Sequence, residues 1–322
     1  MQRRHLLAVP AGLLAAPAVH AQPAWPNRGP IRVIVPFTPG GATDGMARVT
    51  TGKLQEKLGQ TIIVENRPGA NGAMGGQFVA QAAPDGYTFC FSASIQVLAR
   101  FVMRNPGYDP VADLLPVIRV GQGPLLLIQH LPRTPTTLAE TLAAVRANPR
   151  DWSFAVSSLG AAGHLATIEF IRQAGVDIVQ VPYRGTAPAI TDVVAGTTQL
   201  MFDPILATLP QVRGGRVRGL AITAAARSPA APEIPTAQEA GMPGLDIQSW
   251  WGLWGPRGLP PEILARIGEV LRTGMFEADV IQRVATLGIE PLAEPAADFA
   301  GFIRRDVTRA QELLRIANFQ PE

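Results

Sequence analysis

The sequence predicts an α/β fold built from parallel strands and the helices that connect them. Short apolar runs rich in β-branched residues recur along the chain, and most precede a segment whose apolar residues have helical spacing. Turns rich in glycine and proline separate these segments, with 32 Gly and 30 Pro among 322 residues. Such alternation is typical of parallel sheets with right-handed crossovers. The length suits about two domains of ~150 residues each, and a 47% hydrophobic composition supplies their cores.

The N-terminal segment 1–21 predicts a secretory signal peptide. Arg3 and Arg4 form its positive end, a mostly apolar stretch follows, and Ala21 supplies the small residue before the expected cleavage point. The stretch is shorter than the about 20 apolar residues that cross a bilayer, and prolines interrupt it. No later segment of the sequence is long enough without charges or prolines. We therefore expect an exported protein that does not span the membrane, secreted by either the general or the twin-arginine route.

The first strands and helices follow from local patterns. Residues 31–37 form a near-continuous β-branched run, typical of a strand buried on both faces. The helix after it places Met46, Val49 and Leu54 near one face and ends at Gly59. The remaining elements of this part are a strand at 61–65, a helix at 74–82 and a strand at 87–92.

The middle of the chain continues the alternation. The spacing of Thr137 and Glu140 matches a capping box, so a helix begins there and should end near Asn148. Two further helices end at Gly175 and Gly196. The predicted strands of this part are 125–129, 153–156, 178–181, 200–202 and 220–223.

After Thr236 the pattern changes to one aromatic strand and three helices. The strand at 247–254 carries Trp250, Trp251 and Trp254, which we predict to lie in the core. A nucleic-acid stacking platform would have basic residues between the aromatic ones, and this stretch has none. The helices that follow are 261–271, 277–287 and 298–317.

Charge, cysteine and histidine content argue against several classes of protein. The formal net charge is +3, of which Arg3 and Arg4 supply two, so the mature chain is near neutral and is not an electrostatic nucleic-acid binder. A single cysteine excludes an internal disulfide. Beyond the signal segment only His130 and His164 remain, which disfavours a metal site. The sequence has no phosphate-loop motif, and we predict neither a cofactor nor a metal.

Four loops share one design and predict a site for a small carboxylate. They are Phe37–Asp44, Pro68–Gly72, Ser157–His164 and Tyr183–Pro188, and each is rich in glycine or small residues. Each follows the carboxyl end of a predicted strand and leads into a helix, which is where ligands bind in open α/β sheets. Glycine lets the backbone approach a ligand, and the first helical turn offers unpaired N–H groups and partial positive charge. Such amides bind an anion without Lys or Arg.

Individual side chains in and near these loops have two readings each. Asp44 either caps the helix that follows it or contacts a ligand. Tyr183 is either a half-buried aromatic at a strand end or a hydroxyl facing the ligand. His164 fits a packed, hydrogen-bonded histidine better than a base. Asp203 either caps a strand end or positions water in a cleft, and Arg184 fits a solvated loop residue better than a ligand clamp.

Catalytic signatures are missing from the sequence. Ser157 or Ser158 could be drawn as a nucleophile with His164 as its base and Asp203 as the orienting carboxylate. No Gly-x-Ser-x-Gly elbow supports that assignment. We therefore predict a binding protein without catalytic residues, with a periplasmic hydrolase that uses Ser158 and His164 as the alternative.

Over essentially the whole mature length, the chain resembles the Bug-type solute receptors of tripartite tricarboxylate transporters. Several long motifs in the same order carry this resemblance. They are the segments 35–44 (VPFTPGGATD), 65–72 (ENRPGANG), 83–88 (APDGYT), 181–188 (VPYRGTAP), 235–241 (PTAQEAG) and 250–256 (WWGLWGP).

The resemblance implies a two-lobed periplasmic receptor of the type II binding-protein class. It would close around a small carboxylate, held largely by loop N–H groups and ordered water, and deliver it to the membrane permease of the transporter. We expect a monomer; a ligand-sensing role is a weaker alternative. Carried over residue by residue, one lobe would contribute Phe37, Gly40, Gly41, Asp44, Ala70 and Gly72, and the other Ser157, Ser158, Gly160, His164, Tyr183 and Ala187, with Asp203 near the hinge side.

One departure from the family pattern affects ligand identity. Family members often have Gly-x-Gly-Ser before the histidine, whereas this chain has Ser158-Leu159-Gly160-Ala161. The usual serine hydroxyl is therefore missing, so the ligand cannot be copied from relatives.

The strands that pass between the lobes predict their boundaries. We place these crossings near Val120–Leu125 and Leu220–Ala225. Lobe 1 then comprises 22–122 and 223–322, and lobe 2 comprises 123–222. A ligand that contacts both lobes would shift the balance between open and closed forms.

Overall fold

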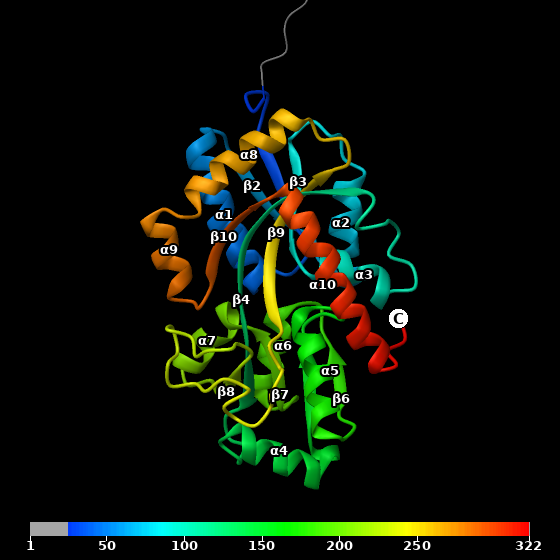
Figure 1. Ribbon diagram of the computed structural model, residues 1–322, viewed down its shortest axis with the longest axis vertical. Helices are drawn as coiled ribbons and strands as arrows, with labels where there is room; N and C mark the ends of the chain where they lie inside the picture. The colour runs from blue at the N-terminus through cyan, green and yellow to red at the C-terminus, as the bar shows by residue number, and fades with distance from the viewer. Residues whose placement is uncertain (1–24, 322) are drawn as a thin grey trace, which may run out of the picture.

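The computed structural model describes residues 25–321 and has the α/β fold that the sequence predicts (Figure 1). The predicted signal peptide, 1–21, lies outside the described residues. Ten strands within 25–321 form one mixed sheet, with the path β2-β1-β3-β9-β4-β7-β5-β6 and with β10 and β8 also paired to β4. Helices cover this sheet in two groups, one at each end of the molecule.

The first half of the sheet contains the N-terminal strands and two late ones. Strands β1 (Ile31–Val35), β2 (Ile62–Asn66) and β3 (Thr88–Ala93) are parallel to each other, and β9 (Gln248–Pro256) is antiparallel to β3. Strand β10 (Glu290–Pro295) pairs with the first part of β4 (Leu114–His130). The helices of this half are α1 (Ala42–Leu58), α2 (Ala73–Ala80), α3 (Ile95–Val102), α8 (Pro261–Gly274), α9 (Ala278–Ala285) and α10 (Ala296–Ile316).

The second half of the sheet is built from the middle of the chain. Strands β5 (Ser153–Val156), β6 (Val179–Pro182) and β7 (Leu200–Pro204) are parallel, and β7 and β8 (Val217–Ile222) pair with the last part of β4. The helices of this half are α4 (Leu138–Ala147), α5 (Ala162–Ala174), α6 (Thr186–Ala195) and α7 (Ile205–Arg213). Within the described residues, no helix combines the length and the apolar character that crossing a membrane demands.

Strand β4 connects the two halves (Figure 1). Its residues 114–124 pair with β9, and its residues 125–130 pair with β7 and β8. The segment after β8 stays beside the second half, because Ala237 N–H donates to Ile222 O and the Thr223 hydroxyl donates to Ile247 O. This packing favours a second crossing at the start of β9 over one near Leu220–Ala225. The division into lobes at 122 and 222 stays a prediction.

The sheet is mixed rather than parallel throughout, and three elements were not predicted. Strands β4 and β9 pass between the halves and run antiparallel to their neighbours, so no crossover helix marks them. Helix α7 contains Pro210, and β10 contains Pro291 and Pro295, residues that argue against a helix interior or a strand. The third unpredicted element is helix α3, whose apolar run cannot be distinguished from a strand by periodicity alone.

The three tryptophans of β9 lie in the core, which confirms the prediction. Trp250, Trp251 and Trp254 are almost fully buried. Trp250 and Trp254 pack against Phe299 of α10 at ring-centroid distances of 5.6 and 5.1 Å. This contact fixes the long C-terminal helix across the face of the sheet, where its far end reaches α5 (Figure 1).

Candidate functional site

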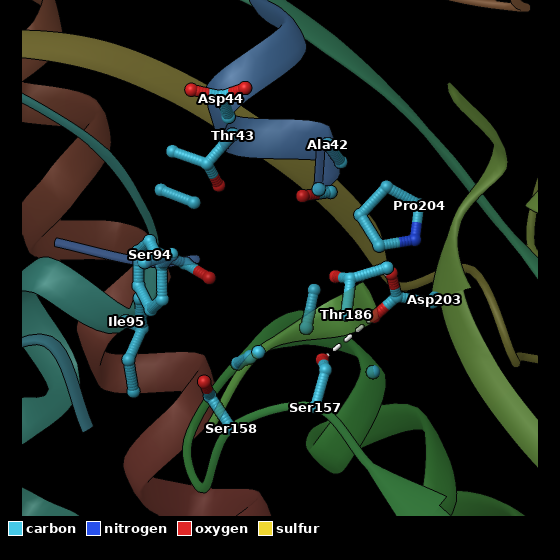
Figure 2. A pocket seen from close by; sticks show the side chains of 18 of the residues that line it. Ala42, Thr43, Asp44, Ser94, Ile95, Ser157, Ser158, Thr186, Asp203 and Pro204 are labelled. Atoms are coloured by element: carbon cyan, nitrogen blue, oxygen red, sulfur yellow. Dashed lines mark hydrogen bonds between the residues drawn. The ribbon is translucent and has the colours of Figure 1, made fainter. Parts of the chain in front are cut away.

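A pocket lies where the two halves meet, at the carboxyl ends of β1, β3, β5, β6 and β7 (Figure 2). Both halves contribute to its wall. The lining residues are Phe37, Thr38, Gly41, Ala42, Thr43, Asp44, Ala93, Ser94, Ile95, Ser157, Ser158, Ala161, Ala162, Gly163, Gly185, Thr186, Asp203, Pro204 and Ser249. None of them is Lys, Arg or His.

Five helices begin at this pocket. Their N-cap residues are Gly41 (α1), Ser94 (α3), Ala161 (α5), Gly185 (α6) and Pro204 (α7), and each of these lines the wall. None of the five helices has a side-chain cap hydrogen bond. The first N–H groups of a helix have no partner within it, and the helix end carries partial positive charge. The helix ends therefore bring partial positive charge to the pocket without a basic side chain.

Two buried hydroxyls in the wall have no hydrogen-bond partner among the described residues: Ser94 Oγ and Thr38 Oγ1. Ser94 is only 3% exposed. An unpaired buried hydroxyl is destabilising, so such groups are normally satisfied by a bound molecule or water. Both hydroxyls therefore lack the partner that a bound molecule or water would supply.

Asp44 stabilises the β1–α1 loop and carries no free charge toward the pocket. Its Oδ2 accepts the Gly40 N–H at 3.0 Å, and its carboxylate also accepts from Arg48 and Asn66, each at 3.0 Å. Burial acts to raise the pKa of Asp44, but these hydrogen bonds outweigh it and lower the pKa below its ordinary value. Gly40 has φ +81°, a conformation that favours glycine. Asp44 is not the N-cap of α1, as one reading expected, because that residue is Gly41 and α1 has no side-chain cap hydrogen bond. The Asp44 carboxylate holds the loop before the helix instead.

Asp203 lies on the opposite side of the pocket and is buried, with no cationic partner among residues 25–321. Its Oδ1 accepts from Ser157 Oγ at 2.7 Å, and its Oδ2 accepts from Thr186 Oγ1 at 2.8 Å (Figure 2). Burial raises the pKa of Asp203 to about 7. Ser157, the nucleophile in one sequence reading, is therefore bonded to Asp203 and not to a histidine.

His164 does not line the pocket. Its Nδ1 accepts the Gly160 N–H at 2.9 Å, and its ring packs edge-on against Phe319 with centroids 5.1 Å apart. Burial lowers the pKa of His164 to about 4, so the ring is neutral. His164 holds the β5–α5 loop in shape, as the packed reading expected.

The opposite pKa shifts of His164 and Asp203 predict opposite pH effects on stability. His164 contributes stability above pH 6.5 that is lost as the pH falls toward 4, and Asp203 contributes stability below pH 3.8 that is lost as the pH rises through about 7. Each effect is on the order of 3 kcal/mol. As the pH rises from 4.5 to 7.5, the stability of His164→Gln should fall relative to that of the wild type, because the variant lacks the gain that His164 gives. Over the same range the stability of Asp203→Asn should rise relative to that of the wild type. Melting temperatures across this range measure both; curves parallel to the wild type would contradict the assignment.

A second, smaller hollow adjoins the pocket through Phe37 and Ser158, and includes Gly72 and Tyr183. The Tyr183 hydroxyl donates to Asp192 Oδ2 at 2.6 Å. Burial raises the pKa of Tyr183 to about 12, and the hydrogen bond to Asp192 contributes to the same shift. Beside this hollow, Asn71 Nδ2 donates to Leu159 O at 2.6 Å, a hydrogen bond between the two halves.

The pocket thus unites some of the predicted site residues and not others. Phe37, Gly41, Asp44, Ser157, Ser158 and Asp203 line it, Gly72 and Tyr183 line the adjoining hollow, and Gly40, Ala70, Gly160, His164 and Ala187 line neither. The sequence analysis missed Ser94 and Ser249. The β3–α3 junction has no glycine to mark it, although a serine before an apolar run is an N-cap signal.

Comparison with known proteins gives a consistent result. Residues 46–319 match the family model described as "Tripartite tricarboxylate transporter family receptor". Protein BugT of Bordetella pertussis is 35% identical over 321 residues, covering 98% of each chain.

Solved structures agree with this match. The periplasmic binding protein BugD is 32% identical, with a TM-score of 0.86 over 91% of this chain and 99% of that one. R. palustris Rpa4515 with adipate is 34% identical, with a TM-score of 0.90 over 92% of this chain and 100% of that one. MatC from Rhodopseudomonas palustris with bound malate is 31% identical, with a TM-score of 0.82 over 88% and 98%.

Proposed function

Because the chain belongs to the tripartite tricarboxylate transporter receptor family, we propose that it binds a small carboxylate in the pocket between its two halves. It is a Bug-type periplasmic solute-binding protein, in a family of solute-binding receptors. The ligand would be held mainly by backbone N–H groups and ordered water, and would be delivered to the membrane permease of a tripartite transporter.

The convergence of five uncapped helix N-termini in a wall without basic residues carries this proposal. Helix N-termini bind carboxylates and phosphates alike, but a phosphate site usually adds Lys or Arg, so the composition of this wall favours a carboxylate. The free hydroxyls of Ser94 and Thr38 would add two hydrogen bonds. Two of the similar structures contain adipate and malate, which are both carboxylates.

Delivery implies that the halves separate and close. We propose that lobe 1 comprises residues 22–122 and the chain from β9 onward, and that lobe 2 comprises the chain between, so that its end moves from the predicted residue 222 to the start of β9. We also propose that export uses the segment 1–21 and that the receptor is monomeric. The contact of Asn71 with Leu159 would then form on closure. A ligand bound to both walls favours the closed form by its difference in affinity for the two states.

A hydrolase on the same scaffold is the less favoured function. A serine hydrolase needs a general base within hydrogen-bond reach of its nucleophile, and the alternative function assigns that role to His164. In this chain the Nδ1 of His164 is occupied by Gly160 N–H, and the ring lies outside the pocket wall. The hydroxyl of Ser157 is directed to Asp203. These contacts support binding without turnover, and neither offers a base for Ser158.

A thermal-shift screen of mono-, di- and tricarboxylates tests the proposal. At least one acid should stabilise the protein, and at about 100 times its Kd it should add about 2.7 kcal/mol to the free energy of unfolding. Mass spectrometry should recover that acid unchanged after incubation. Hits confined to amines or sugars would contradict carboxylate binding, and release of a hydrolysis product would favour the enzyme.

A further inference from the structure

We propose, on the basis of the carboxylate-binding function above, that the ligand is an acid with a hydroxyl or amino group beside its carboxylate, and that Asp203 accepts a hydrogen bond from that group. The site would therefore prefer a substituted acid to an unsubstituted one of equal length.

The Asp203 side of the pocket presents hydrogen-bond acceptors. Each carboxylate oxygen has two lone pairs, and Ser157 and Thr186 each use one. Both hydroxyl protons are committed to Asp203, so the two hydroxyl oxygens also offer lone pairs to the pocket. A ligand group that meets Asp203 or these two hydroxyls must donate a hydrogen bond, whereas a group that meets the first turns of α5 and α6 in the same half can accept one.

No donor from the described part of the chain completes this side. Asp203 is 1% exposed, and its hydrogen bonds within residues 25–321 are the two from Ser157 and Thr186. No Lys, Arg or His in that range forms a salt bridge with it. A buried carboxylate with so few partners is costly, and the cost falls when a neutral or cationic donor pairs with it.

The opposite side of the pocket presents donors. The first turn of α3 supplies N–H groups, and Ser94 supplies a hydroxyl with no partner among the described residues. Figure 2 shows Ser94 and Ile95 on one side and Asp203 and Thr186 on the other. A ligand that extends from Ser94 to Asp203 therefore pairs best when it offers a carboxylate to the first and a donor to the second.

An unsubstituted dicarboxylate meets only half of this requirement. Both of its ends are acceptors when ionised, so its second carboxylate would face the like charge of Asp203. A hydroxyl would satisfy one free lone pair of Asp203, and an ammonium would also neutralise its charge. Both substituents donate a hydrogen bond to Asp203, and the titrations described below distinguish a hydroxyl from an ammonium.

Calorimetric titration at pH 8 with matched acids tests this inference. The pairs are malate and succinate, aspartate and succinate, lactate and propionate, and 2-aminoadipate and adipate. Within at least one pair, we expect the hydroxy or amino acid to bind at least ~10-fold more tightly, which corresponds to about 1.4 kcal/mol. Stronger binding of amino than of hydroxy acids would assign the donor as an ammonium, and the reverse order would assign it as a hydroxyl.

Asp203→Asn is the decisive variant, because an amide keeps the shape and loses the charge. The preference within the pair should fall below ~3-fold, about 0.6 kcal/mol. Asp177→Asn, which removes an exposed carboxylate from the same half, should keep the full preference. The ligand pairs on the wild-type protein test the inference even if Asp203→Asn does not fold.

The outcomes separate this inference from the proposed function. If carboxylates bind but each unsubstituted acid binds as tightly as its substituted partner, the donor requirement is wrong and the carboxylate function stands. Retention of the preference in a folded Asp203→Asn protein would remove Asp203 from the recognition. If no carboxylate binds at all, both proposals fail.

Discussion

Gly41→Val should abolish carboxylate binding while the protein stays folded. Gly41 is the N-cap of α1 with φ −82°, so a side chain causes no backbone strain. A Cβ there would lie 3.4 Å from Thr186 Cβ in the other half, and the two methyl groups of valine would extend further into the pocket. Overpacking of this kind costs about 1–3 kcal/mol. Loss of access to the α1 amides adds to it, so Kd should rise by at least ~100-fold.

The control for this variant lies on the same helix. Gly52 is exposed, and a Cβ there meets nothing within 4 Å. Gly52→Val should raise stability by a few tenths of a kcal/mol, because valine has a slightly higher helix propensity than glycine, and should leave the affinity unchanged. Calorimetric titration with the strongest acid from the screen measures both variants. Wild-type affinity in Gly41→Val would show that the ligand lies elsewhere.

Gly185→Ala should also prevent binding, and Thr38→Ala should partly restore it. A Cβ at Gly185 would lie 2.6 Å from Thr38 Oγ1, across the contact between the halves. Gly185 also has φ +131°, which strains any other residue by about 1–3 kcal/mol. The strain acts whether or not the halves are closed, whereas the clash with Thr38 acts only when they meet.

The double variant Thr38→Ala/Gly185→Ala separates these two effects. Removal of Thr38 Oγ1 relieves the clash, so at least ~10-fold of the lost affinity should return, about 1.4 kcal/mol. The melting temperature should stay low, because the strain at residue 185 remains. Thr38→Ala alone gives the reference for the lost hydroxyl. Equal affinities in Gly185→Ala and in the double variant would argue against contact of these residues on ligand binding.

Local patterns in the sequence predicted the fold where the chain obeys local rules. The β-branched run of β1, the capping box before α4 and the glycines that end α1, α5 and α6 all occupy the positions expected of them. Of the long strand β4, the sequence predicted only residues 125–129, because the first part of the strand contains Pro116, Arg119 and two glycines. Pairing with β9 and β10 holds that part in the sheet, and such tertiary contacts leave no local signal.

The sequence predicted the parts of the site that lie in glycine-rich loops. It missed the part that lies in a loop without glycine. Gly41 and Ser157 line the pocket as expected, and the contribution of Ser94 depends on where β3 places it. His164 and Gly160 were assigned as wall residues and instead bond to each other behind the wall. A sequence motif shows that a loop is needed for the site, but only the fold shows which of its residues face the ligand.

A crystal structure of the complex with the strongest-binding acid would show whether helix N-termini hold the carboxylate. We expect ligand carboxylate oxygens about 3 Å from first-turn nitrogens of α1, α3 or α5, with atoms from both halves in contact with one ligand. A carboxylate paired with Arg48 or Arg184 would contradict it. So would a ligand seated outside the crevice, with those helix ends bound to their own protein.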